Sequence, residues 1–172
     1  TFKVQPQGSL QGSIRVPGDK SISHRAIMMG AIAEGTTQVK GFLEGEDSLA
    51  TLKAFRAMGV TISEPLNGSL RIEGAGLRGL QAPQQPLDMG NSGTAMRLLC
   101  GLLAAQNFSS TLVGDESLST RPMKRVTEPL KAMGAQLELE EGGVAPIKIS
   151  PAQLTAINYS MPVASAQVKS CL

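Results

Sequence analysis

Three polar loops could bind an anion, because each carries suitable side chains and leads directly into an apolar helical pattern. The loops begin near residues 18, 90 and 162. Their candidate ligands are Lys20, Ser21 and Arg25 in the first loop, Asn91, Ser92, Gly93, Thr94 and Arg97 in the second, and Ser165, Gln167 and Lys169 in the third. A helix N-terminus offers unpaired backbone N–H groups and a partial positive charge, so it favours phosphate or carboxylate. Lys and Arg around three such termini predict a site for a substrate with more than one anionic group.

The same residues also allow simpler interpretations. Ser21, Ser92 and Ser165 could act only as helix caps, and Lys20 and Arg25 could be ordinary surface charges. The repetition of the loop pattern favours a functional role, but the residues alone leave both interpretations open.

Other ionisable residues lie near these loops in the sequence. A further cationic group consists of Arg121, Lys124 and Arg125, of which the last two fit a solvated surface as well. For His24 we predict a structural role rather than proton transfer. Glu46 and Asp47 are interpreted as acids that the helix dipole favours in a first turn, rather than as a catalytic pair.

Motif spacing and composition argue against several other classes of site. A kinase-type phosphate-binding loop needs G-x-x-x-x-G-K-[ST], but Asp19 separates Gly18 from Lys20 and no Gly lies five residues before Gly18. The formal net charge is +2 and aromatic residues make up 3% of the chain, so a nucleic-acid partner is not expected. With one His and no metal-type Cys spacing, we predict no metal and no cofactor.

Cys100 and Cys171 lie in the apolar runs RLLCGLLAA and VKSCL, so we predict that both are small core residues rather than ligands or disulfide partners. No apolar stretch approaches the length needed to span a bilayer, so no membrane partner is expected. A cytoplasmic location is the resulting expectation.

Internal repetition predicts how the three loops are positioned. The expected first helices are residues 23–33, 94–105 and 166 onward, followed by strands 37–42 and 111–113. The expected second helices are residues 47–58 and 127–133, followed by the strand pairs 60–63 with 70–73 and 136–140 with 146–150. Equivalent first helices should point the same way, so their N-terminal loops should converge at one end of the domain.

Each repeat is interpreted as a βαβαββ unit, so the predicted fold class is α/β (α+β), with two complete units and the start of a third. Asp47 is expected to cap the helix at 47–58, and Pro122 and Pro129 are expected to break the second helix of the second unit. Because the third unit is incomplete at Leu172, we interpret the chain as truncated.

Four motifs, in this order along the chain, are similar to those of a known family. They are PGDKSISHR from Pro17, GNSGTAMR from Gly90, LSTRPM from Leu118 and SAQVKS from Ser165. Together they resemble the 5-enolpyruvylshikimate-3-phosphate synthase family, and their wording is closer to its bacterial class II branch. The resemblance implies two similar domains, each an inside-out barrel of three βαβαββ units with the helices inside and the sheets outside. It assigns residues 1–13 to the second domain, which is missing here, and residues 14–172 to an incomplete first domain.

The resemblance also implies transfer of the enolpyruvyl (1-carboxyvinyl) group from phosphoenolpyruvate to the 5-hydroxyl of shikimate 3-phosphate, with release of phosphate. This reaction belongs to the shikimate pathway to aromatic amino acids, and the family is the target of glyphosate. Lys20 would be catalytic and would contact both substrates. Shikimate 3-phosphate would be bound by Lys20, Ser21, Arg25, Ser165, Ala166 and Gln167, and phosphoenolpyruvate by Lys20, Gly93, Arg121 and Gln167, with Asn91 and Thr94 as secondary candidates. The family's other catalytic residues lie in the missing half, so we expect the chain alone to be inactive.

Two other functions are considered. A sister transferase acting on a UDP-sugar would share the fold and use phosphoenolpyruvate, but that branch lacks the DKSISHR wording. A non-catalytic module that binds anions or nucleic acid through Arg121, Lys124 and Arg125 would need more positive charge and more aromatic residues than this chain has.

Overall fold

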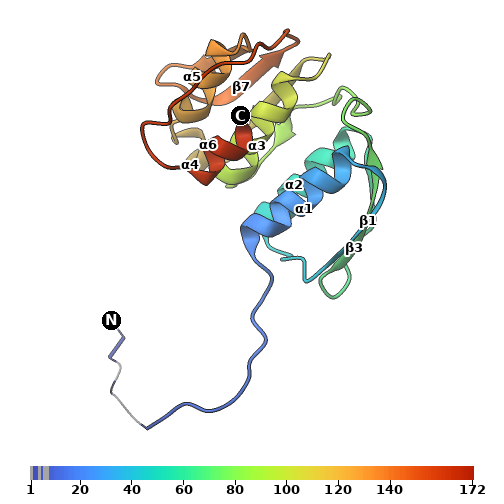
Figure 1. Ribbon diagram of the computed structural model, residues 1–172, viewed down its shortest axis with the longest axis vertical. Helices are drawn as coiled ribbons and strands as arrows, with labels where there is room; N and C mark the ends of the chain where they lie inside the picture. The colour runs from blue at the N-terminus through green and yellow to red at the C-terminus, as the bar shows by residue number, and fades with distance from the viewer. Residues whose placement is uncertain (1, 4, 6–7) are drawn as a thin grey trace.

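Two related blocks of helices and strands follow one another along the chain (Figure 1). The computed structural model describes residues 2–3, 5 and 8–172. The first block comprises α1 (Lys20–Ile32), β1 (Glu34–Lys40), α2 (Glu46–Ala57), β2 (Thr61–Ile62) and β3 (Ser69–Ala75). The second comprises β4 (Leu87–Asp88), α3 (Gly93–Ala104), β5 (Ser110–Val113), α4 (Glu116–Ser119), α5 (Lys124–Ala132), β6 (Gln136–Glu140) and β7 (Val144–Ser150), and α6 (Ala166–Cys171) follows it. The second block has the predicted βαβαββ order with α4 as an extra turn, whereas the first block has no strand before α1 among the described residues.

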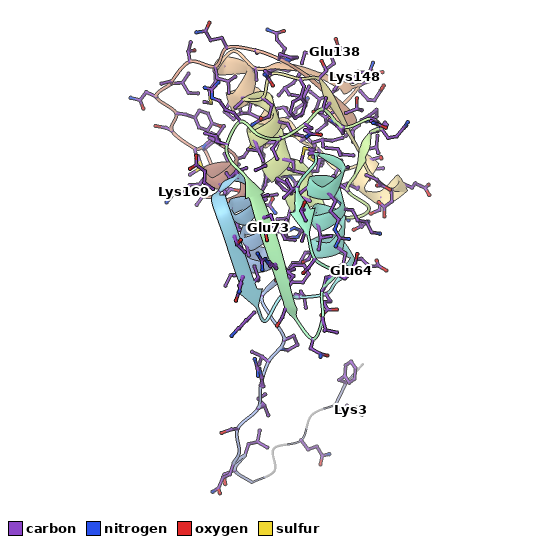
Figure 2. The ribbon with its side chains drawn as sticks, turned by 90° about the vertical axis from the view of Figure 1, so that its right-hand side faces the viewer. Lys3, Glu64, Glu73, Glu138, Lys148 and Lys169 are labelled. Atoms are coloured by element: carbon purple, nitrogen blue, oxygen red, sulfur yellow. The ribbon has the colours of Figure 1, made fainter. Side chains whose placement is uncertain are left out.

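Each block carries a sheet, and the two sheets repeat the same pairing. The first sheet has the strand order β1-β3-β2, with β1 and β3 antiparallel from Glu34↔Ala75 to Lys40↔Ser69. The second has the order β4-β5-β7-β6, in which β4 adds a parallel strand beside β5. Figure 2 shows β1 and β3 lying over α1, with Glu73 labelled on β3. The helices therefore cover one face of the sheet, and side chains along β3 alternate between buried and exposed.

Leu, Ile, Met and Phe side chains form a core between the helices and the sheets. Leu52, Phe55 and Met58, which recur at helical spacing on one face of α2 and just after it, are each at most 2% exposed. The strand predicted at residues 136–140 is present as β6, and Leu137 is buried between exposed neighbours. Helix α3 is apolar on most sides and contacts several other elements, including α1, α2, α5 and α6. Its position at the centre follows from that composition.

Side-chain caps start the three helices that follow the polar loops. Asp19 accepts a hydrogen bond from the first turn of α1 at 2.7 Å, and Ser92 and Ser165 do the same for α3 and α6 at 3.2 and 3.3 Å. Ser21 lies inside the first turn of α1, so the interpretation of Ser21 as a cap is wrong. Figure 1 shows α1, α3 and α6 running in the same direction, so their N-termini lie at the same end, as the repeat predicted.

Two predictions about helix ends are wrong. Pro129 lies inside α5, where its buried ring packs in the core and only one helical hydrogen bond is lost. The helix continues past it, since Met133 N donates to Pro129 O at 3.0 Å. Asp47 does not cap α2, because the N-cap is Gly45 and Asp47 is the second residue of the helix. Its interpretation as a first-turn acid is confirmed.

Both cysteines are buried, as predicted. Cys100 is 0% and Cys171 8% exposed, and both are free thiols. Burial raises the pKa of both thiols, that of Cys171 to about 12, so both are protonated at neutral pH.

The described residues include no helix that is long and apolar enough to cross a membrane, and no cluster of His, Cys, Asp and Glu suited to a metal ion. The domain boundary predicted after residue 13 stays a prediction. The segment 1–13 includes residues 1, 4, 6 and 7, which lie outside the described residues.

Candidate anion-binding site

Helix α3 lies against α6, and Gly101 in the C-terminal half of α3 allows a close approach. A Cβ atom at Gly101 would lie 1.8 Å from the carbonyl oxygen of Cys171. This packing places Gln167 against the first turns of α3. Gln167 donates from Nε2 to Thr94 Oγ1 at 3.0 Å, and its Oε1 accepts a hydrogen bond from Arg97 at 3.1 Å. Two predicted site residues, Thr94 and Gln167, are therefore in direct contact.

Arg121 is held against the loop before α3. Its guanidinium donates to Asn91 Oδ1 at 2.6 Å, to Asn91 O at 3.3 Å and to Ser117 Oγ at 3.2 Å. Asn91 in turn donates from Nδ2 to the two carboxylate oxygens of Asp115 at 3.1 and 2.8 Å. These contacts fix the orientation of the planar fork with which Arg can bind an oxyanion.

Gly93 faces the two guanidinium groups. A Cβ atom on this buried residue would lie 3.0 Å from Arg97 Nη1 and 3.6 Å from Arg121 Nη1. A side chain at Gly93 would therefore occupy the space beside both cations. The glycine leaves that space open to a ligand.

Three guanidinium groups, from Arg97, Arg121 and Arg125, are gathered here without a carboxylate partner in the ion pairs of the described residues. Burial lowers the pKa of Arg97, and the charges of Arg121 and Arg125 lower it further. A cavity of about 230 Å³ is lined by Arg97, Pro122, Arg125, Ser165, Gln167 and Val168. An anion bound here would relieve the repulsion among the cations.

A larger cavity of about 660 Å³ lies at the opposite end of α3. It is lined by Arg78, Ala105, Gln106, Asn107, Pro151, Ala152, Gln153 and Leu154. Its lining contains a single cation, so we assign the anion site to the smaller cavity at the helix N-termini.

The first loop makes a different set of contacts. Lys20 forms an ion pair with Asp47 of α2, and its side chain stays 51% exposed. Arg25 donates to Ser170 Oγ at 2.7 Å and to Ser21 O at 3.2 Å, which links α1 to α6. The ion pair between Lys20 and Asp47 has no signal in the sequence, since nothing in a one-dimensional pattern joins two different helices.

The structure brings most of the predicted site residues to one end of the molecule. One contact network contains Asn91, Gly93, Thr94, Arg97, Arg121 and Gln167. Ser165 caps the helix that carries Gln167, while Ser21 and Ala166 are exposed in the first turns of α1 and α6. Lys169, labelled in Figure 2, and Lys124 are exposed.

His24 is buried between α1 and α2 and has a structural contact. Its Nδ1 forms a hydrogen bond with Thr51 Oγ1 at 2.7 Å, and Thr51 Oγ1 also lies 3.4 Å from Asp47 O. Among the described residues Nε2 has no hydrogen-bond partner. Burial lowers the pKa of His24, Asp47 opposes this effect, and Lys20 and Arg25 reinforce it. The geometry supports the structural role predicted for this residue.

His24 is expected to make stability depend on pH. Because its pKa falls below 6.5 on folding, its stabilising contribution is fully present above pH 6.5 and is lost as the pH falls towards the folded-state pKa. The urea midpoint should therefore fall between about pH 7 and pH 5, and less steeply in the His24→Gln variant. His24 is the single histidine, so its ring protons can be titrated directly by NMR. A folded-state pKa at or above 6.5 would contradict this account.

Fold and site together define an α/β protein with a cationic site where helix N-termini meet. The model of the family described as EPSP synthase (3-phosphoshikimate 1-carboxyvinyltransferase) matches residues 4–172. The chain belongs to this family.

Curated relatives and solved structures show how much of a family member this chain spans. It is 65% identical to the 3-phosphoshikimate 1-carboxyvinyltransferase of Hydrogenovibrio crunogenus, over 99% of this chain and 39% of that protein. The protein of the same name from Methylococcus capsulatus is 63% identical over the same shares. A structure of EPSP synthase from Acinetobacter baumannii matches this chain with 60% identity and a TM-score of 0.90. The match covers 93% of this chain and 36% of the Acinetobacter chain. The chain thus spans less than half the length of these relatives.

Proposed function

We propose that this chain supplies part of the active site of a 3-phosphoshikimate 1-carboxyvinyltransferase, which transfers the enolpyruvyl group of phosphoenolpyruvate to the 5-hydroxyl of shikimate 3-phosphate. The observation that carries the proposal is the convergence of Arg97, Arg121 and Gln167 at the N-termini of α3 and α6, in a chain of this family. Both substrates carry a phosphate and a carboxylate, which suits a group of cations without carboxylate partners.

The proposed division of roles follows the two sides of this site. Phosphoenolpyruvate would lie beside Gly93, in reach of Arg121 and Gln167, with Asn91 and Thr94 holding those two side chains. Shikimate 3-phosphate would lie between α1 and α6, bound by Ser21, Arg25, Ser165, Ala166 and Gln167. Lys20 would exchange its ion pair with Asp47 for contacts with both substrates.

The 5-hydroxyl of shikimate 3-phosphate would lose its proton as its oxygen adds to C2 of phosphoenolpyruvate, while C3 gains a proton. The tetrahedral intermediate would then lose phosphate from C2 and a proton from C3, which restores the double bond of the enolpyruvyl group. The cations of this chain would contribute in two ways. They hold two anions together against their mutual repulsion, which supplies proximity. They also stabilise negative charge on the departing phosphate.

Phosphate release from phosphoenolpyruvate tests this proposal. The assay is run on the chain alone and on the chain joined to the remaining part of the Hydrogenovibrio relative, with and without shikimate 3-phosphate. We expect no turnover by the chain alone and turnover by the joined enzyme only when shikimate 3-phosphate is present. An inactive joined enzyme that is folded would overturn the proposal, as would turnover with a UDP-sugar instead.

Gly93→Ala is expected to weaken binding of phosphoenolpyruvate to the joined enzyme about tenfold, because the added methyl group would press against Arg97 and narrow the space beside Arg121. Binding of the phosphonate glyphosate should be weakened as well, while the KM for shikimate 3-phosphate should change little. Gly45→Ala is a matched control, because its Cβ would make only an ordinary contact with Leu43 at 3.8 Å. Unchanged affinity for phosphoenolpyruvate and glyphosate would remove Gly93 from the site.

A cytoplasmic location and the lack of nucleic-acid or membrane partners stay predictions from the sequence. Binding of the chain to nucleic acid with a steep salt dependence would contradict the second of these.

A further inference from the structure

Asp115, the N-cap of α4, contacts both this short helix and the loop that precedes α3. Its Oδ1 accepts a hydrogen bond from Leu118 N at 2.7 Å, which caps the short helix. Its backbone N–H donates to Gly90 O at 2.9 Å, and its carboxylate accepts from Asn91 Nδ2 at 2.8 and 3.1 Å. The carboxylate is therefore fixed beside the loop that precedes α3, although it is exposed to solvent.

The contact with Asp115 determines which way the Asn91 amide faces. An ionised carboxylate only accepts hydrogen bonds, so the NH₂ group of Asn91 must point towards Asp115. The amide oxygen of Asn91 then points to the other side, where it accepts from Arg121 at 2.6 Å. If the amide turned over, its NH₂ group would face the guanidinium, and two donors would meet.

Asp115 stays ionised through the neutral range. The hydrogen bond from Asn91 lowers the pKa of Asp115, as do the Leu118 N–H and the positive charge of Arg121. The Asp115 carboxylate therefore remains ionised at neutral pH and stays available to accept the hydrogen bonds from Asn91.

We propose that Asp115 is a positioning residue that orients Arg121 for phosphoenolpyruvate through the side-chain amide of Asn91. The inference rests on the proposed function and extends it to a residue outside the binding site itself. It predicts that loss of the Asp115 carboxylate weakens the binding of phosphoenolpyruvate far more than the binding of shikimate 3-phosphate.

Asp115→Asn is the sharpest variant, because it keeps the shape of the side chain and an oxygen that can cap α4. Its new NH₂ group faces the Asn91 amide and removes the fixed acceptor. In the joined enzyme we expect the KM for phosphoenolpyruvate to rise about tenfold, with kcat and the KM for shikimate 3-phosphate nearly unchanged.

Glu116→Gln is the matched control. Glu116 is the next residue and is also exposed, and its substitution removes the same charge, but it makes no side-chain hydrogen bond among the described residues. If the two variants have the same KM for phosphoenolpyruvate, Asp115 acts only through its charge and the proposal is overturned. A loss of affinity for both substrates to the same extent would overturn it too.

A second measurement decides the proposal even if the joined enzyme is inactive, which would contradict the proposed function alone. In the chain itself, NMR at low temperature follows the exchange with water of the Asn91 side-chain NH₂ protons and of the Arg121 Nη protons, which donate to Asn91. We expect faster exchange at both groups in Asp115→Asn, and unchanged exchange in Glu116→Gln. Unchanged exchange in Asp115→Asn would show that the carboxylate does not order this pair.

Discussion

Replacing Arg121 with Gln is expected to lower kcat/KM for phosphoenolpyruvate in the joined enzyme by roughly a hundredfold or more. Arg121 is held by Asn91 and Ser117, so its fork is oriented before a ligand arrives. Gln keeps a polar group but loses both the charge and the paired donors. Steady-state kinetics with each substrate varied in turn measures the effect.

Two further variants separate charge from geometry at this position. Arg121→Lys keeps the positive charge without the planar fork, so it should recover only part of the activity. Arg78→Gln makes the same charge change at the opposite end of α3 and should leave kcat/KM nearly unchanged. Near-normal kinetics in Arg121→Gln would remove Arg121 from the site.

Gly101→Ala is expected to destabilise the chain by about 1–3 kcal/mol and to impair the site at the same time. Helix propensity alone predicts the opposite sign, because Ala is favoured over Gly in a helix interior by about 1 kcal/mol. The steric term should win, since the new Cβ would lie 1.8 Å from the carbonyl oxygen of Cys171 and a backbone atom cannot rotate away. Helix α6 must therefore move.

Movement of α6 would separate Gln167 from Thr94 and Arg97, and Ser170 from Arg25. Urea unfolding of the chain and turnover of the joined enzyme measure the two consequences. Gly45→Ala is again a control, because it adds a methyl group without a close contact, and as an N-cap change in α2 it should cost at most about 1 kcal/mol. A Gly101→Ala variant that is more stable than the parent and fully active would contradict the close packing of α3 against α6.

Features with a local signal in the sequence were the ones that could be predicted. The βαβαββ repeat and the common direction of α1, α3 and α6 follow from hydrophobic periodicity and recurring loops. Ser92 and Ser165 as caps follow from their position before an apolar helix. By contrast, β4 is two residues long and α4 four, too short for any periodic pattern. The prediction that Pro129 breaks the helix was wrong because burial of its ring in the core outweighs one lost helical hydrogen bond.

The residues of the candidate site also fall into those that could be predicted from the sequence and those that could not. The cations and the loops that carry them were predicted, because residue type and position before a helix are visible in the sequence. The carboxylates that hold two of these side chains were not. Asp47 pairs with Lys20 across two helices, and Asp115 reaches Arg121 through Asn91. Such contacts depend on how distant segments pack, which one sequence does not reveal.

The two buried, protonated thiols make the molecule convenient for site-specific labelling. A maleimide reacts with an accessible thiolate, and neither Cys100 nor Cys171 offers one at neutral pH. A cysteine introduced at the exposed Lys169 on α6 would therefore react first. A fluorophore attached there would report ligand binding beside α6 with both native cysteines left in place.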